Sequence, residues 1–143
     1  MEQTITEFRI MGIDYGEKRI GIALSDPLLT FAYPYITIQN DLALMNNLSV
    51  IIKEKNVSKI ILGLPSSRFK ASDMLAMKVR NLKNEIESNL NIEVQLWDEE
   101  YSSILAEQKI IESVTKKTKR KDKELIDKQS AAIILQEYLD SKK

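Results

Sequence analysis

The 143-residue chain contains no cysteine and no histidine. The absence of cysteine excludes disulfide bonds, and the absence of both residues excludes the usual zinc sites. It also excludes catalytic systems in which a histidine activates a serine or a cysteine. Any bound metal ion would therefore be held by oxygen ligands, which favours Mg²⁺ or Mn²⁺.

Long hydrophobic runs and an excess of charge of one sign are also missing. No apolar segment approaches the roughly 18 residues that a membrane span needs. The N-terminal segment 1–7 is acidic and lacks the apolar core of a signal peptide. We therefore expect a cytoplasmic protein with no membrane partner. The 21 basic and 21 acidic residues balance, which argues against a general polyanion binder. The length predicts a single domain over residues 1–143.

The segment 10–25 predicts two β-strands joined by a tight turn, with Asp14 near the end of the first strand. Strand interiors disfavour both aspartate and glycine. The presence of Asp14 between Gly12 and Gly21 in an otherwise apolar hairpin therefore indicates that something approaches this carboxylate closely.

The turn of this hairpin predicts its register. Gly16 and Glu17 suit a two-residue turn with glycine first. This turn would place Asp14 opposite Arg19, and Gly12 opposite Gly21. Strand alternation then puts Gly12 and Asp14 on one face of the sheet.

The rest of the chain alternates strand patterns with apolar residues at helical spacing. We expect strands over 8–15, 20–25, 35–38, 57–64 and 92–97, and helices over 42–55, 73–90, 102–114 and 123–139. Asp41 is the expected cap of the first helix. The order β-β-β-α-β-α-β-α-α predicts an α/β fold in which helices pack on a mixed five-stranded sheet.

Acidic residues fall at the ends of separate elements. Asp14 ends the first strand, Asp98 and Glu99 follow the last strand, and Asp127 shares the apolar face of the closing helix. Ligands bind at strand ends in open α/β sheets. Carboxylates that converge there could hold two divalent cations about 4 Å apart for phosphodiester cleavage.

Each acid also has a simpler explanation. Asp14 could pair with Arg19 across the hairpin, Glu99 could lie in a solvated loop, and Asp127 could be favoured by the helix dipole. The combination of these acids in a chain without histidine or cysteine favours the metal site.

Basic residues near these acids are candidates for contacts with phosphate groups. The tract 116–121 could be a solvated linker or a phosphate-contacting loop beside the acidic site. The candidates for nucleic-acid binding are Lys18, Arg19, Lys116, Lys117, Lys119, Arg120 and Lys121.

Four segments of the chain resemble the YqgF/RuvX family of bacterial RuvC-like Holliday junction resolvases, also described as pre-16S rRNA nucleases. They are 13–26, 61–65, 97–103 and 126–140, in the family's order and over nearly the whole chain. The resemblance implies a ribonuclease H-like fold with a divalent-metal site. Asp14, Glu99 and Asp127 match the family's catalytic acids, with Asp98 as a further metal ligand. Glu100 departs from the pattern, because the family usually has arginine there.

On this basis we expect an endonuclease that uses Mg²⁺ or Mn²⁺, with two ions, and acts on structured nucleic acid. The favoured reaction is processing of the 5′ end of pre-16S rRNA. A Holliday junction in DNA is the alternative substrate, and a homodimer would supply the two active sites that junction cleavage needs. Glu100 motivates a second hypothesis, an RNA-binding or ribosome-assembly module without catalysis. A third, an ATP-binding relative of actin, lacks a second lobe and a phosphate-binding glycine loop.

Overall fold

The fold is built on one five-stranded sheet. The structure is a computed structural model that describes residues 7–64, 71–98 and 119–142, and the side chains of these residues except 71, 72 and 119–128. Its elements are β1 (Arg9–Asp14), β2 (Arg19–Ser25), β3 (Ala32–Gln39), α1 (Leu44–Lys55), β4 (Val57–Leu64), α2 (Ala71–Leu90), β5 (Glu93–Asp98) and α4 (Lys119–Ser141). The predicted helix over 102–114 lies outside the described residues.

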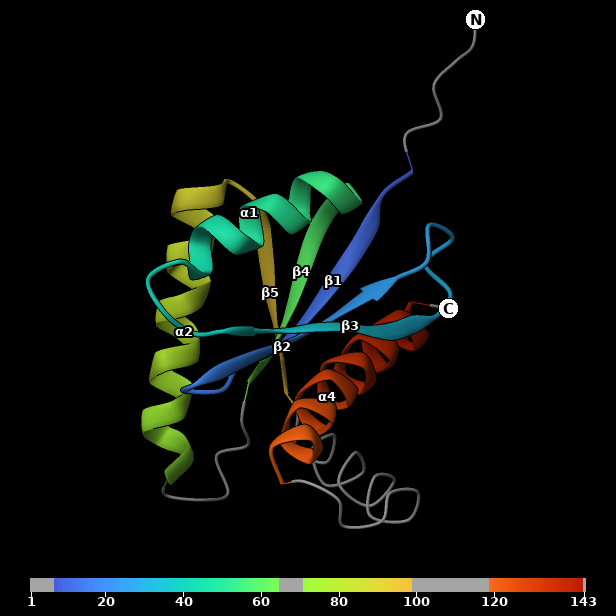
Figure 1. The fold of residues 1–143 in the computed structure, drawn as a ribbon. Coiled ribbons are helices and arrows are strands. Elements are labelled where there is room, and N and C mark those ends of the chain that lie inside the picture. The colour runs from blue at the N-terminus through green and yellow to red at the C-terminus, as the bar shows by residue number, and fades with distance from the viewer. Residues whose placement is uncertain (1–6, 65–70, 99–118, 143) are drawn as a thin grey trace, which may run out of the picture.

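The sheet has the strand order β3-β2-β1-β4-β5. The pairs β1–β2 and β2–β3 are antiparallel, whereas β1, β4 and β5 run parallel. Helices α1 and α2 cover one face of the sheet, and α4 crosses the other (Figure 1). The predicted mixed sheet is therefore confirmed. No helix in the described part of the chain is long and apolar enough to cross a membrane.

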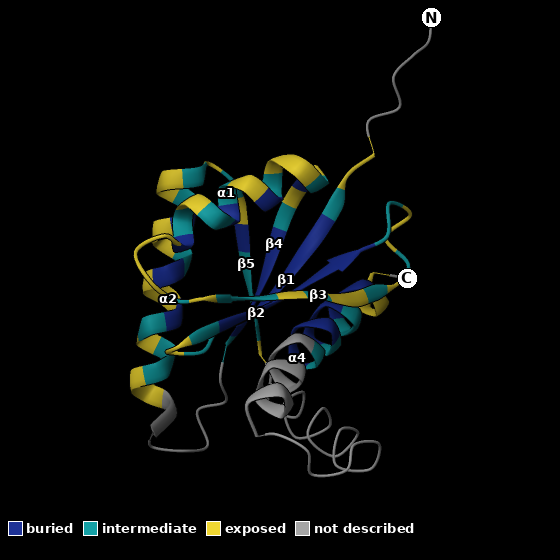
Figure 2. Ribbon diagram, viewed as in Figure 1, coloured by how far each residue is buried: buried dark blue, intermediate teal, exposed yellow. Residues whose placement is uncertain are grey.

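The central strands are buried between the helices (Figure 2), and strand alternation divides the core between the two faces of the sheet. In β1, Met11 and Ile13 pack under α1 and α2. Ile10 instead belongs to the cluster that α4 covers, together with Ala131 and Leu135. This division confirms the face predicted for each residue of β1.

The register of the β1–β2 hairpin differs from the prediction. Asp14 pairs with Gly21, not with Arg19, and Gly12 pairs with Ala23, not with Gly21. The connection between the strands comprises residues 15–18 rather than a two-residue turn. Because the register moves by two residues and side chains alternate with a period of two, every side chain keeps its predicted face.

Asn40 stabilises this longer connection. Its side chain donates a hydrogen bond to the carbonyl oxygen of Gly16, 2.9 Å away, and its backbone N–H donates to that of Lys18 at 3.0 Å. A Cβ at Gly16 would overlap the carbonyl oxygen of Arg19, so the loop requires glycine there.

Other predicted boundaries are also wrong, among them those of β3, α1 and α4. Strand β3 runs through Pro34, which an edge strand tolerates. Helix α1 has Ala43 as its N-cap; Asp41 instead accepts a hydrogen bond from the Ala43 N–H at 2.9 Å. Helix α4 begins at Lys119, four residues before the predicted start at Lys123, so the end of the basic tract is helical.

Gly12 allows α4 to lie close to β1. A Cβ at Gly12 would stand 2.8 Å from the carbonyl oxygen of Ala131 and 2.8 Å from Cβ of Leu135. Residue 12 is buried. The interpretation that Gly12 clears space for a ligand is therefore wrong, because α4 occupies that space.

We predict that Gly12→Ala lowers the free energy of unfolding by about 1–3 kcal/mol, the usual cost of overpacking a core. The new methyl group would meet the backbone of α4, which can relieve the clash only by moving as a whole. Denaturant unfolding followed by circular dichroism measures the change. The exposed Val50→Ala serves as control, with an expected change within about 0.5 kcal/mol. Equal midpoints for Gly12→Ala and the parent would contradict the close approach of α4.

Candidate active site at the carboxyl ends of the parallel strands

The three parallel strands end at one edge of the sheet. Strand β1 ends at Asp14, β4 at Leu64 and β5 at Asp98. Ile13 pairs with Leu62, and Leu64 pairs with Asp98, so the three ends lie nearly level. The carboxyl ends of parallel strands are where open α/β sheets bind ligands. This edge is therefore the candidate site.

Asp14 is positioned by the central strand of the sheet. It shares the face of Ile10 and Gly12, which α4 covers, and it is half-buried. Its partner on β2 is Gly21. Gly21 is itself buried, so it does not open the β2 side of Asp14 to solvent.

Helix α4 runs in the opposite direction to β1. Ala131 and Leu135 lie over Gly12, whereas Tyr138 contacts Lys59, near the start of β4. From Gly12 to Asp14 the strand advances about 6.7 Å, which about four residues of helix span. The helical turn before Ala131 is thus level with Asp14.

Asp127 belongs to that turn of α4, four residues before Ala131. The face of α4 predicted to carry it does pack on the sheet, because Ala131, Ile134 and Tyr138 are all buried. The side chain of Asp127 lies outside the described residues, as does the whole of Glu99. Their roles as ligands stay predictions.

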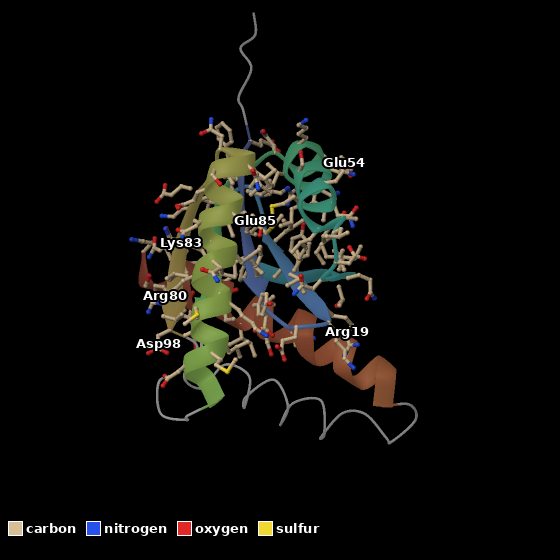
Figure 3. The ribbon with its side chains drawn as sticks, turned by 90° about the vertical axis from the view of Figure 1, so that its left-hand side faces the viewer. Arg19, Glu54, Arg80, Lys83, Glu85 and Asp98 are labelled. Carbon is tan, nitrogen blue, oxygen red and sulfur yellow. The ribbon has the colours of Figure 1, made fainter. Side chains whose placement is uncertain are left out.

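Asp98 projects from the opposite face of the sheet. Its partner Leu64 packs in the cluster under α1 and α2, whereas the preceding Trp97 packs in the cluster under α4. Asp98 is exposed beside α2 (Figure 3). The structure therefore does not bring Asp98 together with Asp14.

Trp97 connects the end of β5 to α4. Its indole N–H donates a hydrogen bond to Glu137 at 3.1 Å. Its ring meets the Tyr138 ring edge to face, with centroids 5.7 Å apart. Trp97 therefore packs, partly buried, against the core cluster under α4, and it holds α4 to β5 beside the candidate site.

Lys59 extends this connection on its other side. Its ammonium group donates to the Tyr138 hydroxyl at 3.1 Å and forms an ion pair with Glu93 at 3.4 Å. The hydrogen bond with Tyr138, together with Glu93, raises the pKa of Lys59 above its ordinary value. Lys59 is thus a permanent cation at neutral pH, and it stabilises the C-terminal half of α4 against β4.

The basic residues predicted to bind phosphate are divided by the structure. Lys18 is exposed in the β1–β2 connection, and Arg19 begins β2 at the same end of the sheet as Asp98 (Figure 3). Strand alternation gives Arg19 the face of Gly21 and Asp14.

The remaining basic candidates lie outside what the structure describes. The backbones of Lys119, Arg120 and Lys121 form the first described turn of α4, and their side chains are not described. Lys116 and Lys117 lie wholly outside the described residues.

An ion pair fixes the connection that carries Lys18. Lys78 of α2 donates to the Glu17 carboxylate, and this hydrogen bond lowers the pKa of Glu17. The loop is thereby tied to α2, on the face of the sheet opposite Asp14.

Among the side chains that the structure describes, no three acidic groups come together as a metal site. Two of the three predicted acids are not among them. The donors that the sequence offers are oxygen atoms, which suit Mg²⁺ or Mn²⁺. Ser130 gives a structural indication of a polar occupant: its hydroxyl is buried on α4 without a hydrogen-bond partner. Sequence reasoning missed Ser130, although its position three residues after Asp127 on the buried helix face was a usable signal.

We predict that Trp97→Ala lowers the free energy of unfolding by about 3 kcal/mol, because it removes a large packed ring and its hydrogen bond. Trp97→Phe retains the ring contact with Tyr138 and should cost less than half as much. Thermal melts followed by far-ultraviolet circular dichroism compare the two variants. Equal losses for both would show that ring packing does not connect β5 to α4.

Comparisons with known proteins converge on one family. A family model described as RuvX, Holliday junction resolvase, matches residues 8–141. A protein of Desulforamulus reducens named "Putative pre-16S rRNA nuclease" is 38% identical over 135 residues, which cover 93% of this chain and 97% of that protein. A protein of the same name from Endomicrobium trichonymphae is 42% identical over 134 residues, covering 92% of this chain and 95% of its own length.

Solved structures share the fold. RuvC of Thermus thermophilus in complex with a Holliday junction substrate aligns with a TM-score of 0.56 at 9% identity, covering 94% of this chain and 95% of that one. The fowlpox virus resolvase in complex with Holliday junction DNA aligns with a TM-score of 0.51 at 18% identity. The alignment covers 93% of this chain and 97% of the resolvase. These likenesses confirm the predicted ribonuclease H-like fold.

Proposed function

Because the chain belongs to the RuvX family, we propose that it is a divalent-metal-dependent endonuclease that processes the 5′ end of pre-16S rRNA. The observation that carries this proposal is the match to relatives named as pre-16S rRNA nucleases over more than 90% of both chains. The position of Asp14, at the end of the central strand and level with the Asp127 turn of α4, agrees with it.

The proposed metal ligands are Asp14, Glu99 and Asp127. We favour Glu99 over Asp98 because Asp98 projects from the other face of the sheet. When bound, two Mg²⁺ or Mn²⁺ ions would activate a water molecule and stabilise the leaving oxygen of the phosphodiester. The fold holds the backbone positions of two of these residues: Asp14 sits on the central strand, and the Asp127 turn precedes the part of α4 that contacts Gly12.

The proposed phosphate contacts surround this edge of the sheet. Lys18 is exposed in a loop that Asn40 and the Glu17–Lys78 ion pair hold in place. Arg19 shares the face of Asp14, on the far side of Gly21.

The substrate is proposed to be RNA rather than branched DNA. The two relatives described above, both named for pre-16S rRNA, are 38% and 42% identical over nearly the whole chain, whereas the two junction-bound structures are 9% and 18% identical and share only the fold. Cleavage of one RNA strand needs a single active site, so this proposal does not depend on a homodimer.

We predict that Asp14→Asn lowers the rate of Mg²⁺-dependent cleavage of a pre-16S rRNA 5′ fragment by at least about 1,000-fold. The loss of one carboxylate from the metal site removes about 4 kcal/mol of transition-state stabilisation. Asp98→Asn is the matched control, and it should keep a rate near that of the parent. Gel electrophoresis of end-labelled RNA measures both rates, with a four-way DNA junction as the competing substrate. Undiminished cleavage by a folded Asp14→Asn variant would refute the proposed site.

We also predict that Lys18→Gln reduces the salt dependence of RNA binding. Each lost phosphate contact should lower the slope of log affinity against log salt by about 0.7–0.9. Binding is measured by filter retention with the Asp14→Asn variant, so that cleavage does not intervene. Lys53→Gln, which makes the same charge change near the end of α1 at the opposite edge of the sheet, should leave the slope unchanged. If Asp14→Asn alone, Asp14→Asn with Lys18→Gln and Asp14→Asn with Lys53→Gln all give the same slope, then Lys18 does not contact the RNA.

A binding module without catalysis would behave differently from a nuclease. It would show the same salt dependence but no scission with Mg²⁺ or Mn²⁺. Site-specific scission by the parent protein that the Asp14→Asn variant lacks would therefore dismiss this alternative.

A further inference from the structure

Ser130 is a buried polar residue without a described partner. Only two polar residues are buried among those that the structure describes, Ser25 and Ser130, both at 0% exposure. The hydroxyl of Ser25 accepts a hydrogen bond from the Ile10 N–H at 2.9 Å. The hydroxyl of Ser130 has no hydrogen-bond partner. Because an unbonded buried hydroxyl is costly and rare in folded proteins, it calls for an explanation.

The two sides of α4 are identified by their contacts. Gln136 bonds to the segment around the start of β3, because it accepts from the Ala32 N–H and donates to the Thr30 carbonyl. Glu137 contacts β5 through Trp97. Ser130 precedes Glu137 by seven residues, close to two helical turns, so Ser130 lies on the side of α4 that faces β5.

Ser130 is also level with the candidate site. It directly precedes Ala131, whose carbonyl oxygen lies over Gly12, and the turn of α4 before Ala131 lies toward the carboxyl end of β1. Asp127 is three residues earlier in the helix, and Asp14 is the residue of β1 level with this turn. Ser130 is therefore at the height of Asp14 along the sheet, within one helical turn of Asp127.

We propose that Ser130 is a positioning residue, whose hydroxyl, unbonded in this structure, donates a hydrogen bond to a carboxylate oxygen of the metal-binding cluster around Asp14 when the metal ion binds. The inference rests on the proposed metal site. Ionised carboxylates only accept hydrogen bonds, so a buried hydroxyl is a suitable donor to them. A carboxylate held in this way presents its other oxygen to the metal ion in a fixed orientation, which is the usual role of groups that bond to metal ligands.

A packing role makes a different prediction. The neighbours Ala131 and Ala132 are small and buried, and serine could occupy position 130 only because it is small. Alanine would then serve equally well at position 130, and Ser130→Ala would leave the affinity for metal ions unchanged. The two roles are therefore separated by metal binding rather than by stability.

The test is isothermal titration calorimetry with Mn²⁺ alone on the full chain. We expect Ser130→Ala to weaken Mn²⁺ binding about 10- to 100-fold, the usual effect of removing a group that orients a metal ligand. Its melting temperature without metal should equal or exceed that of the parent, because the unbonded hydroxyl is gone. Ser141→Ala is the matched control on the same helix; its hydroxyl bonds to the Tyr138 carbonyl, far from the site, and its loss should leave Mn²⁺ affinity unchanged.

Two further measurements sharpen the result. Ser130→Thr retains the hydroxyl and should bind Mn²⁺ nearly as the parent does; a folded threonine variant that binds as weakly as Ser130→Ala would overturn the proposal. In cleavage assays, Ser130→Ala should need more Mn²⁺ for half-maximal rate and approach the parent rate at saturating Mn²⁺. Parent-like Mn²⁺ affinity in Ser130→Ala would also overturn it.

Failure of this inference is distinguishable from failure of the proposed function. If the parent binds Mn²⁺, Asp14→Asn does not, and Ser130→Ala binds normally, then only the role of Ser130 is wrong. If the parent and Asp14→Asn bind Mn²⁺ equally, then the proposed metal site itself is wrong, and the role of Ser130 fails with it.

Discussion

The close approach of α4 to the central strand β1 is the contact on which the arrangement of the site depends. It exists because position 12 is glycine, so that a helix carbonyl and the Cβ of Leu135 can occupy the volume that a side chain would fill. Asp14 lies two residues further along the strand, and the Asp127 turn precedes Ala131 on the helix. The contact between Gly12 and α4 thus fixes the position of the Asp127 backbone relative to Asp14 along the strand direction. Trp97 and Lys59 secure the rest of α4 against β5 and β4.

The sequence predicted the fold well where periodicity carries the signal. The apolar run of β4 was predicted with its observed bounds, and the faces of β1 were correct because they depend only on the alternation of side chains. The errors concern local hydrogen bonds that periodicity does not encode. The hairpin register depends on a loop that Asn40 stabilises from the far end of β3, and the start of α1 depends on a turn in which Asp41 bonds to Ala43.

The candidate site was predicted in part. The position of Asp14 at the end of the first strand follows from the sequence, and so does the buried face of α4; the central place of that strand in the sheet comes from the structure. The sequence could not choose between Asp98 and Glu99, because that choice depends on the residue at which β5 ends and on the side that each residue faces; the register with β4 places Asp98 on the α2 side. Ser130 was overlooked because serine at a buried helix position looks like any small residue until its lack of a partner is seen.

The edge strand β3 has a consequence for how the molecule behaves among its own copies. Pro34 has no N–H group, and the pairing of β2 with β3 shifts register beside it, between Ile22 and Ala23. Such an interruption blunts an exposed strand as a template for a strand from another chain. The β3 edge of the sheet is thereby protected against edge-to-edge aggregation. Pairing of two molecules through their β3 strands into one continuous sheet is thus disfavoured.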